Sequence, residues 1–372
     1  MKRVLFVLGT RPEAIKLCPV IARAREQNAG FETRVCITAQ HREMLDQVLD
    51  IFGVSPDYDL NVMSPGQSLF ESTTKILSGL QGVLSDGVDL VVVQGDTTTT
   101  FCASLAAFYA RVPVGHVEAG LRTGDYTHPF PEEMNRVLTS RLTTMHFAAT
   151  ESAAENLRRE GIRNEAIWVT GNPVIDAVQS TREALECGRL PCPVWDWRNE
   201  AKRMILVTAH RRESFGLPLE NICRALANLA KRSDIQIVYP VHPNPQVQEP
   251  AYRILRNEAN VILLQPQSYV PFVDLMRRAE ILLTDSGGVQ EEGPSLGKPV
   301  LVMRETTERP EAVAAGVARL IGMNEDRITR EVTALLTDRR QYEKMARTVN
   351  PYGDGRASER IVSAICKWFS AE

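Results

Sequence analysis

The chain has 372 residues, of which 44% are hydrophobic and 24% charged, with a formal net charge of -3. This length predicts two or three domains, because a single hydrophobic core stops growing well below this size. The composition is typical of a soluble globular protein. The near-balanced charge argues against binding of nucleic acid through a strongly basic surface, and no apolar stretch reaches the length of a membrane span.

The cysteines and the first residues indicate a cytoplasmic protein. All seven cysteines occur singly, and the closest two, Cys187 and Cys192, lack metal-ligand spacing. The first apolar run, residues 4–8, is too short for a signal peptide and is predicted to be a buried strand. No triplet of potential ligands and no GxGxxG motif is present, so we expect neither a metal nor a nicotinamide cofactor.

The first half of the chain alternates short β-branched runs with amphipathic stretches, a pattern that predicts a parallel sheet with helices on both faces. The expected strands are residues 4–8, 34–38, 90–93, 114–117 and 145–148. The expected helices lie near residues 12–27, 42–53, 67–84, 98–109, 131–141 and 151–160.

A turn-rich segment, residues 184–201, is predicted to link this domain to a second one of the same kind. The alternation resumes with strands expected at 204–208, 235–239, 261–264, 281–284 and 300–303, and helices near 325–337, 340–347 and 355–369. We therefore predict an α/β fold of two Rossmann-like doubly wound domains, residues 1–184 and 185–352, facing a central cleft at the carboxyl ends of both sheets.

A Ser-Gly-Gly turn follows the apolar run at 281–284 and opens a helix-like segment. In one interpretation Ser286, Gly287 and Gly288 present backbone N–H groups to a phosphate at the positive end of a helix, with Glu292 placed to accept hydrogen bonds from a ribose. In the other, Ser286 is a helix cap and the glycines only turn the chain.

Two cations follow the first expected strand. Arg11 stands at the entrance of a helix that Pro12 is suited to begin, and Lys16 lies one turn further on. Positive charges at a helix N-terminus are locally unfavourable, which suggests an anion between them. A pair of solvated surface charges is the alternative.

Two carboxylates also follow expected strands. Asp96 comes directly after residues 90–93, where it serves either as a helix cap or as a functional carboxylate. Glu118 ends residues 114–117 in the same way, but glutamate is a poor capping residue. Glu118 is therefore the sharper indication of a functional group.

The long loop at residues 119–130 leads into Glu132 and Arg136, which are spaced to share one face of a helix. The spacing is explained either by a surface ion pair or by a catalytic carboxylate held by an arginine. In the second half, His210 and His242 each follow an expected strand, on the edge that carries Ser286. Their shared position favours contact with phosphate or sugar over a purely structural role.

Taken together, these segments resemble the bacterial non-hydrolysing UDP-N-acetylglucosamine 2-epimerases. The resemblance rests on GTRPEAIK at 9–16, AQHR at 39–42, QGDT at 94–97, GHVEAGLR at 115–122, HRRE at 210–213, HPNP at 242–245, DSGG at 285–288 and NPYGDG at 350–355. It implies a fold of the glycosyltransferase-B type, a homodimer, and a C-terminal helix, residues 353–372, that packs back on the N-terminal domain.

The resemblance also implies roles for individual residues. The UDP-binding positions would be Ser286, Gly287 and Gly288 at the diphosphate, Glu292 at the ribose, Gln267 and Phe272 at the uracil, Arg11 and His210 as further phosphate contacts, and Arg309 closing the pocket. Lys16, Asp96, Glu118, Glu132 and Arg136 would surround the sugar. Catalysis would fall to Asp96, Glu118 and Glu132, assigned jointly, with His210 and Arg136.

The implied activity interconverts UDP-GlcNAc and UDP-ManNAc for surface polysaccharide synthesis, through elimination of UDP to a 2-acetamidoglucal and its re-addition. A second UDP-GlcNAc would bind near Gln40 and His41 as an allosteric activator. Three alternatives remain: a hydrolysing epimerase, a retaining glycosyltransferase of the same fold, and a binding protein without catalysis.

Overall fold

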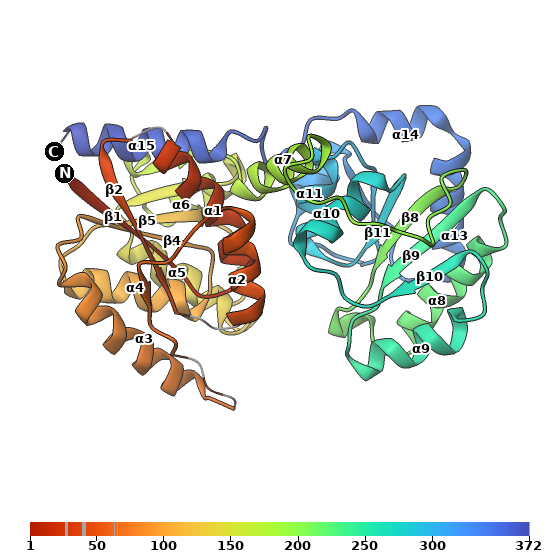
Figure 1. Cartoon of the computed structure of the whole chain (residues 1–372), viewed down its shortest axis with the longest axis horizontal. Coiled ribbons are helices and arrows are strands. Elements are labelled where there is room, and N and C mark those ends of the chain that lie inside the picture. The colour runs from red at the N-terminus through yellow and green to blue at the C-terminus, as the bar shows by residue number, and fades with distance from the viewer. Residues whose placement is uncertain (27–28, 39–41, 63, 65, 372) are drawn as a thin grey trace. The chain divides into compact units, whose positions relative to one another are not determined.

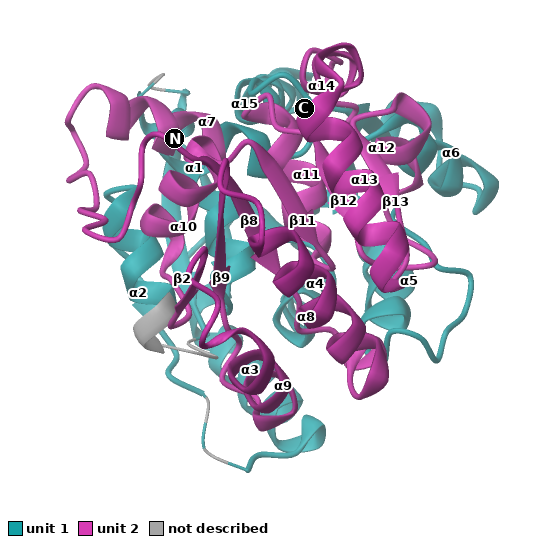
Figure 2. Cartoon of the chain, turned by 90° about the vertical axis from the view of Figure 1, so that its right-hand side faces the viewer, with its two compact units in different colours: residues 1–177, 352–372 teal, residues 178–351 magenta. Residues whose placement is uncertain are grey.

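The computed structural model describes residues 1–26, 29–38, 42–62, 64 and 66–371. The chain forms two compact units, shown in separate colours in Figure 2. Unit 1 comprises residues 1–177 and 352–372, and unit 2 comprises residues 178–351. Figure 1 labels most of their helices and strands.

Unit 1 is built on a seven-stranded parallel sheet in the order β3-β2-β1-β4-β5-β6-β7. Residues 4–8 of its first strand are completely buried, as expected for a strand covered by helices on both faces. Its strands are β1 (Lys2–Leu8), β2 (Phe31–Ile37), β3 (Tyr58–Asp59), β4 (Leu90–Gln94), β5 (Val114–Ala119), β6 (Met145–Ala148) and β7 (Ile167–Val169). Its helices are α1 (Arg11–Glu26), α2 (Arg42–Ile51), α3 (Leu69–Leu84), α4 (Thr98–Tyr109), α5 (Glu132–Leu142), α6 (Glu151–Arg159), the start of α7 (Pro173–Glu186) and α15 (Ala357–Ala371).

Unit 2 is built on a six-stranded parallel sheet in the order β10-β9-β8-β11-β12-β13. Its strands are β8 (Arg203–Thr208), β9 (Ile235–Pro240), β10 (Val261–Leu264), β11 (Ile281–Thr284), β12 (Val300–Val302) and β13 (Ala318–Leu320). Its helices are α8 (Leu217–Ala230), α9 (Pro245–Leu255), α10 (Tyr269–Arg278), α11 (Gly287–Ser295), α12 (Pro310–Ala315), α13 (Glu325–Thr337) and α14 (Arg339–Ala346).

Both sheets have the doubly wound arrangement that the alternating pattern predicts. The chain builds each sheet outward in one direction and then returns to build it in the other, so β1 lies beside β4 and β8 lies beside β11. Loops leaving the carboxyl ends of such a central pair separate toward opposite faces, and this switch point is where ligands bind in open α/β sheets. The first places to look for a site are therefore the loops after β1, β4, β8 and β11.

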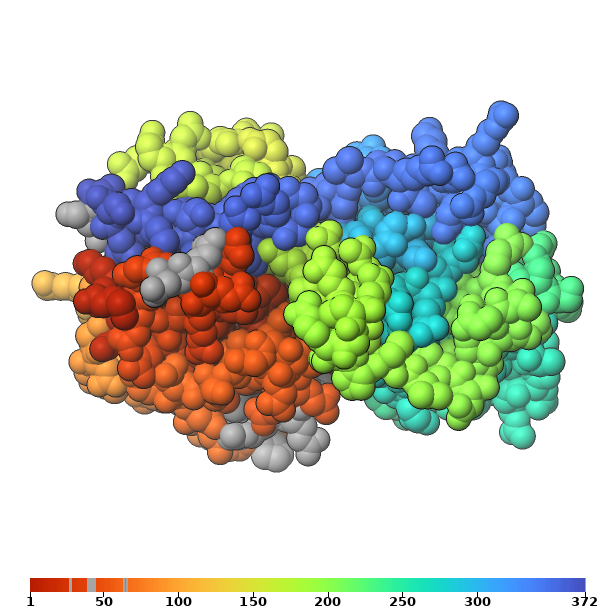
Figure 3. All heavy atoms as spheres, turned by 45° about the horizontal axis from the view of Figure 1, so that its top comes forward, coloured from red at the N-terminus to blue at the C-terminus, as the bar shows by residue number. Residues whose placement is uncertain are grey.

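The C-terminal segment returns to unit 1. The carboxylate of Asp176, in α7, accepts hydrogen bonds from the backbone nitrogens of Ala357 (3.2 Å) and Ser358 (2.8 Å) at the start of α15. At the other end of α15, the ring of Phe369 lies 6.1 Å from that of Phe31. Figure 3 shows these C-terminal residues, in blue, on the surface of unit 1 beside the N-terminal residues in red. The boundary expected at residue 184 falls within the last turn of α7.

Over the ranges given above, no helix is long and apolar enough to cross a membrane.

Candidate active site

A buried carboxylate joins the two loops at the switch point of unit 1. Glu13, in the first turn of α1, is 1% exposed and accepts hydrogen bonds from the backbone nitrogens of Gly9 (3.0 Å) and Thr10 (2.7 Å). Its other oxygen accepts from the hydroxyl of Thr97 (2.7 Å), in the loop after β4. Burial raises the pKa of Glu13, although these hydrogen bonds oppose the shift. The loop after β1, which leads into Arg11, and the loop that carries Asp96 are thus held to each other.

Glu118 has an unusual backbone conformation at the end of β5. Its φ is +64°, in the left-handed region that L-residues seldom adopt, and the pairing of β5 with β6 shifts register between Val117 and Ala119. Such a bulge redirects a side chain at a sheet edge, and the strained backbone needs support from its surroundings. The predicted functional glutamate is therefore also a backbone outlier.

Three side chains from separate elements donate hydrogen bonds to the Glu118 carboxylate. The Nζ atom of Lys16, in α1, lies 2.7 Å from both carboxylate oxygens, and the Nδ2 atom of Asn172 lies 2.9 Å from Oε1. The side-chain amide of Gln94, at the end of β4, donates to Oε2. An ammonium group and two amides favour the ionised form of a carboxylate that is only 5% exposed.

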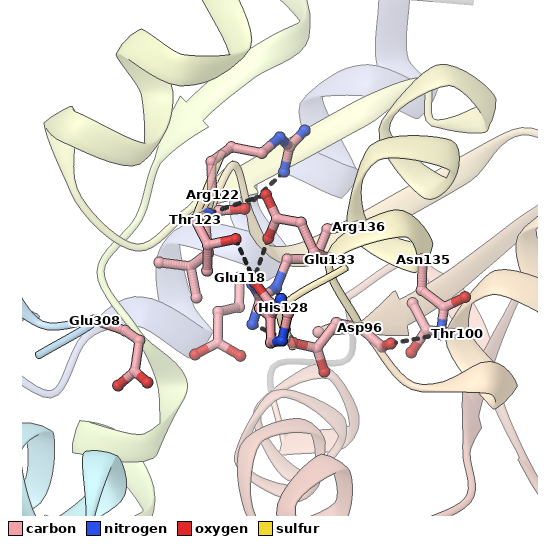
Figure 4. A network of polar contacts seen from close by, with 12 residues as sticks. Asp96, Thr100, Glu118, Arg122, Thr123, His128, Glu133, Asn135, Arg136 and Glu308 are labelled. Carbon is pink, nitrogen blue, oxygen red and sulfur yellow. Dashed lines mark hydrogen bonds and ion pairs between the residues drawn. The ribbon is translucent and has the colours of Figure 1, made fainter. Parts of the chain in front are cut away.

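Asp96 is held by the helix that follows the long loop. Nε and Nη2 of Arg136 contact its Oδ2 at 2.8 and 2.6 Å, and Asn135 donates to its backbone carbonyl at 2.9 Å. Arg136 also pairs with the buried Glu133 at 2.7 Å, and Glu133 accepts from the backbone nitrogen of Thr123 at 2.9 Å. Figure 4 shows this network, which links the loop at 119–130 to the switch point.

The predicted pairing of Glu132 with Arg136 is not found. Arg136 contacts Asp96 and Glu133, while the half-buried Glu132 makes no side-chain hydrogen bond or ion pair within the described ranges. Residues i and i+3 are also neighbours on a helix, so Glu133 can pair with Arg136 as the i,i+4 spacing had suggested for Glu132. Glu133 is a site-supporting residue that the sequence did not single out.

His116, two residues before Glu118, supports the neighbouring loop. Its Nε2 donates to the backbone carbonyl of Gly95 over 2.7 Å. Burial lowers the pKa of His116 to about 4, so the ring is neutral near pH 7. A neutral imidazole with Nε2–H therefore fixes the residue that precedes Asp96.

The switch point of unit 2 has the features of an anion site. Ser286 is the N-cap of α11, but its side chain makes no capping hydrogen bond, contrary to the plain capping interpretation. A Cβ atom built on Gly287 would lie 3.6 Å from Nη2 of Arg211 and 3.8 Å from Nη2 of Arg309. Two guanidinium groups thus flank the first turn of a helix, whose N-terminal N–H groups favour negative charge.

The loop after β8 is held by Asp285, at the end of β11. This completely buried carboxylate accepts from the backbone nitrogens of His210 (2.6 Å) and Arg211 (2.7 Å). The ring of His210 stacks on that of His242, with centroids 5.5 Å apart, so the two predicted histidines lie together. Burial lowers the pKa of His210, while the nearby Asp285 opposes the shift.

The remaining predicted residues differ in their burial and contacts. Arg11 is half-buried at the first position of α1, and its guanidinium has no hydrogen-bond partner in the part of the chain that is described. Gln267 is half-buried and donates to the carbonyl of Gln265 at 2.6 Å, and Phe272 is half-buried in α10. Glu292 is buried in α11. Gln40 and His41 lie outside the described residues.

Within those same residues, no cluster of three or more His, Cys, Asp or Glu side chains could hold a metal ion.

Two doubly wound parallel sheets, each with polar side chains at its switch point, define a two-domain α/β protein of the glycosyltransferase-B type. The model of the family described as UDP-N-acetylglucosamine 2-epimerase matches residues 23–366. The chain belongs to this family. Membership confirms the enzyme class that the sequence motifs indicate, an epimerase of the non-hydrolysing type.

Relatives and solved structures extend the match over nearly the whole chain. The chain is 58% identical to the UDP-N-acetylglucosamine 2-epimerase of Salmonella typhimurium and 56% identical to that of Escherichia coli K12, with 98% of each chain covered in both comparisons. It is similar to the Neisseria meningitidis enzyme bound to UDP-GlcNAc, with a TM-score of 0.90, 51% identity, and coverage of 98% of this chain and 100% of that one. The Methanocaldococcus jannaschii enzyme in complex with UDP-GlcNAc and UDP has a TM-score of 0.80 and 34% identity, with coverage of 98% and 99%.

Proposed function

We propose that this chain interconverts UDP-GlcNAc and UDP-ManNAc by reversible epimerisation at C2 of the sugar. The observation that carries the proposal is Glu118, a buried carboxylate in a left-handed backbone conformation, held by Lys16, Gln94 and Asn172. Backbone strain of this kind at a sheet edge is characteristic of functional positions, and packing alone gives no reason for it. The names of the relatives support the same substrate.

The first step of the proposed reaction breaks the bond between C1 of the sugar and the diphosphate oxygen. Negative charge then develops on the leaving UDP. Backbone N–H groups of Gly287 and Gly288, the Ser286 hydroxyl and the guanidinium groups flanking them would stabilise that charge. His210 and Arg11 are proposed as further phosphate contacts.

Loss of a proton from C2 accompanies loss of UDP and leaves a C1–C2 double bond in a 2-acetamidoglucal. In the reverse direction a UDP oxygen bonds to C1 and a proton returns to the opposite face of C2. A base is needed on one side of the ring and an acid on the other. Asp96, Glu118 and Glu132 come from three different segments of unit 1, and we assign the two proton transfers to them jointly. Lys16 would hold Glu118 and Arg136 would hold Asp96.

The nucleoside is assigned to unit 2. Glu292 would accept hydrogen bonds from the ribose, and Gln267 and Phe272 would border the uracil. Elimination and re-addition involve no net oxidation, so the proposed chemistry needs no redox cofactor. We further propose that the protein is a cytoplasmic homodimer serving surface polysaccharide synthesis, and that a second UDP-GlcNAc activates it near Gln40 and His41.

The product of the reaction tests the proposal directly. The purified protein is incubated with UDP-GlcNAc alone, without acceptor or added metal, and nucleotides and free sugars are separated by chromatography. We expect a mixture of UDP-GlcNAc and UDP-ManNAc that reaches a constant ratio. Free ManNAc with an equal amount of UDP would instead indicate the hydrolysing reaction. No turnover would leave a transferase, which needs an acceptor, or a binding protein without catalysis.

A further inference from the structure

Asn172 lies where the chain leaves unit 1. It is the residue between Gly171 and the first residue of α7, Pro173, and it is 1% exposed. The chain passes into unit 2 within α7, after residue 177, and returns to unit 1 at Tyr352. The backbone nitrogen of Asn172 donates to the carbonyl oxygen of Tyr352 over 2.7 Å. The outgoing and returning segments are therefore hydrogen-bonded to each other at this residue.

Two glycines allow the returning segment to approach this closely. Gly171 has a φ of +86° and Gly353 a φ of +138°, conformations that favour glycine. A Cβ atom at Gly171 would lie 3.3 Å from the carbonyl oxygen of Tyr352, and one at Gly353 would lie 3.6 Å from the backbone nitrogen of Asn172. The two backbones pack directly on each other.

The side chain of Asn172 is oriented by contacts at both ends. Its Oδ1 accepts from the backbone nitrogen of Val174 over 3.1 Å. An oxygen must face that N–H donor, so the Nδ2 group necessarily faces Glu118, to which it donates over 2.9 Å. The amide thus reaches from the crossing point of the chain to the carboxylate of the site.

From these contacts we propose that Asn172 is a positioning residue, which holds the Glu118 carboxylate in place and ties it to the returning segment at Tyr352. This inference rests on the proposed function, because Glu118 is assigned there as a catalytic carboxylate. Glu118 sits in a strained conformation that external contacts must maintain. Lys16 and Gln94 hold it from α1 and the sheet, and Asn172 connects it to the segment that returns from unit 2.

The isosteric substitution Asn172→Asp tests this role. It keeps an oxygen for the backbone of Val174 and replaces the donor with an acceptor that faces Glu118. We expect kcat for UDP-GlcNAc to fall about 10- to 100-fold, the range that corresponds to a hydrogen bond to a charged group. KM should change little, because Asn172 is not among the proposed nucleotide contacts. The acidic limb of the pH–rate profile should move to higher pH, because two adjacent carboxylates disfavour the ionised pair.

Asn156→Asp is the matched control. Asn156 also donates its Nδ2 in unit 1, but to the backbone carbonyl of Gly120, and it does not contact Glu118. Its kcat and pH profile should match those of the unaltered chain. If Asn172→Asp gives the same kcat and pH profile as Asn156→Asp, the positioning role is wrong.

The double variant Glu118→Gln/Asn172→Asp separates this contact from a general loss of stability. It reverses donor and acceptor, so its melting temperature should rise above that of Asn172→Asp alone. If the single variant fails to fold, the double variant should still fold. A double variant no more stable than the single one would overturn the inference. If the proposed function is wrong, the unaltered chain will not convert UDP-GlcNAc. The comparison of melting temperatures would still test the contact between Asn172 and Glu118 in that case.

Discussion

We expect Lys16→Met to destabilise unit 1 by about 3 kcal/mol, because it removes an ammonium group that pairs with a buried carboxylate. Nζ of Lys16 lies 2.7 Å from Glu118, and the two side chains are only 14% and 5% exposed. At an effective dielectric constant of about 20, one such pair corresponds to about 6 kcal/mol. The loss of stability is smaller than this value, because methionine has no charge to desolvate and because Gln94 and Asn172 still donate to Glu118. Breaking a buried ion pair costs about 3–5 kcal/mol in general, so we expect a loss at the lower end of that range.

The assay must report on unit 1 separately, because two units can unfold in separate transitions. Equilibrium unfolding in urea, with pulsed hydrogen exchange read on peptides from β4 and β5, meets this need. Lys2→Met is the control, since Lys2 pairs with Asp89 at 3.3 Å with side chains 47% and 32% exposed. Such a pair contributes about 0–1 kcal/mol. If Lys16→Met costs no more than Lys2→Met, the reasoning about the buried pair is refuted.

Two further predictions concern pH and the anion site. The pKa of His116 is lowered from 6.5 to about 4 in the folded chain, so below pH 6.5 the unfolded chain takes up a proton that the folded one does not. The free energy of unfolding should therefore fall by about 3 kcal/mol from this group between pH 6.5 and 4. His116→Asn should make the free energy of unfolding, measured in urea, depend less on pH. An unchanged pH dependence would contradict this. Gly287→Ala should leave the melting temperature nearly unchanged, because its Cβ meets only ordinary contacts, yet weaken UDP binding about 10-fold by blocking the first turn of α11. Calorimetric titration with UDP measures this, and an unaltered affinity would remove the anion site from this position.

The sequence predicted the central strands and one edge strand, β10, and missed the other three edge strands. Continuous apolar runs identify strands buried on both faces, such as β1, β4 and β11, because helices cover both sides of them. The strands β3, β7 and β13 are two or three residues long and partly exposed, so they have no such run. The sequence analysis also missed helix α7, which ends inside the segment 184–201 that is predicted to be the linker.

The site was predictable where a residue type conflicted with its local role. Glu118 was singled out because glutamate caps helices poorly, and it proves to be a backbone outlier. Its partners Gln94 and Asn172 could not be foreseen, since only the folded sheet brings the end of β4 and the start of α7 to β5. The pairing of Arg136 with Glu133 instead of Glu132 depends on the rotational phase of α5, which the irregular loop before it leaves undefined in the sequence.

Proton exchange at C2 tests the central claim most directly. The purified protein is incubated with UDP-GlcNAc in D2O and followed by proton NMR. The account predicts that UDP-ManNAc appears and that deuterium enters C2 of both sugar nucleotides, because the proton is lost and returned while UDP is retained at equilibrium. UDP-ManNAc that forms with its C2 proton retained would contradict it, since carboxylates around the sugar would then not exchange that proton.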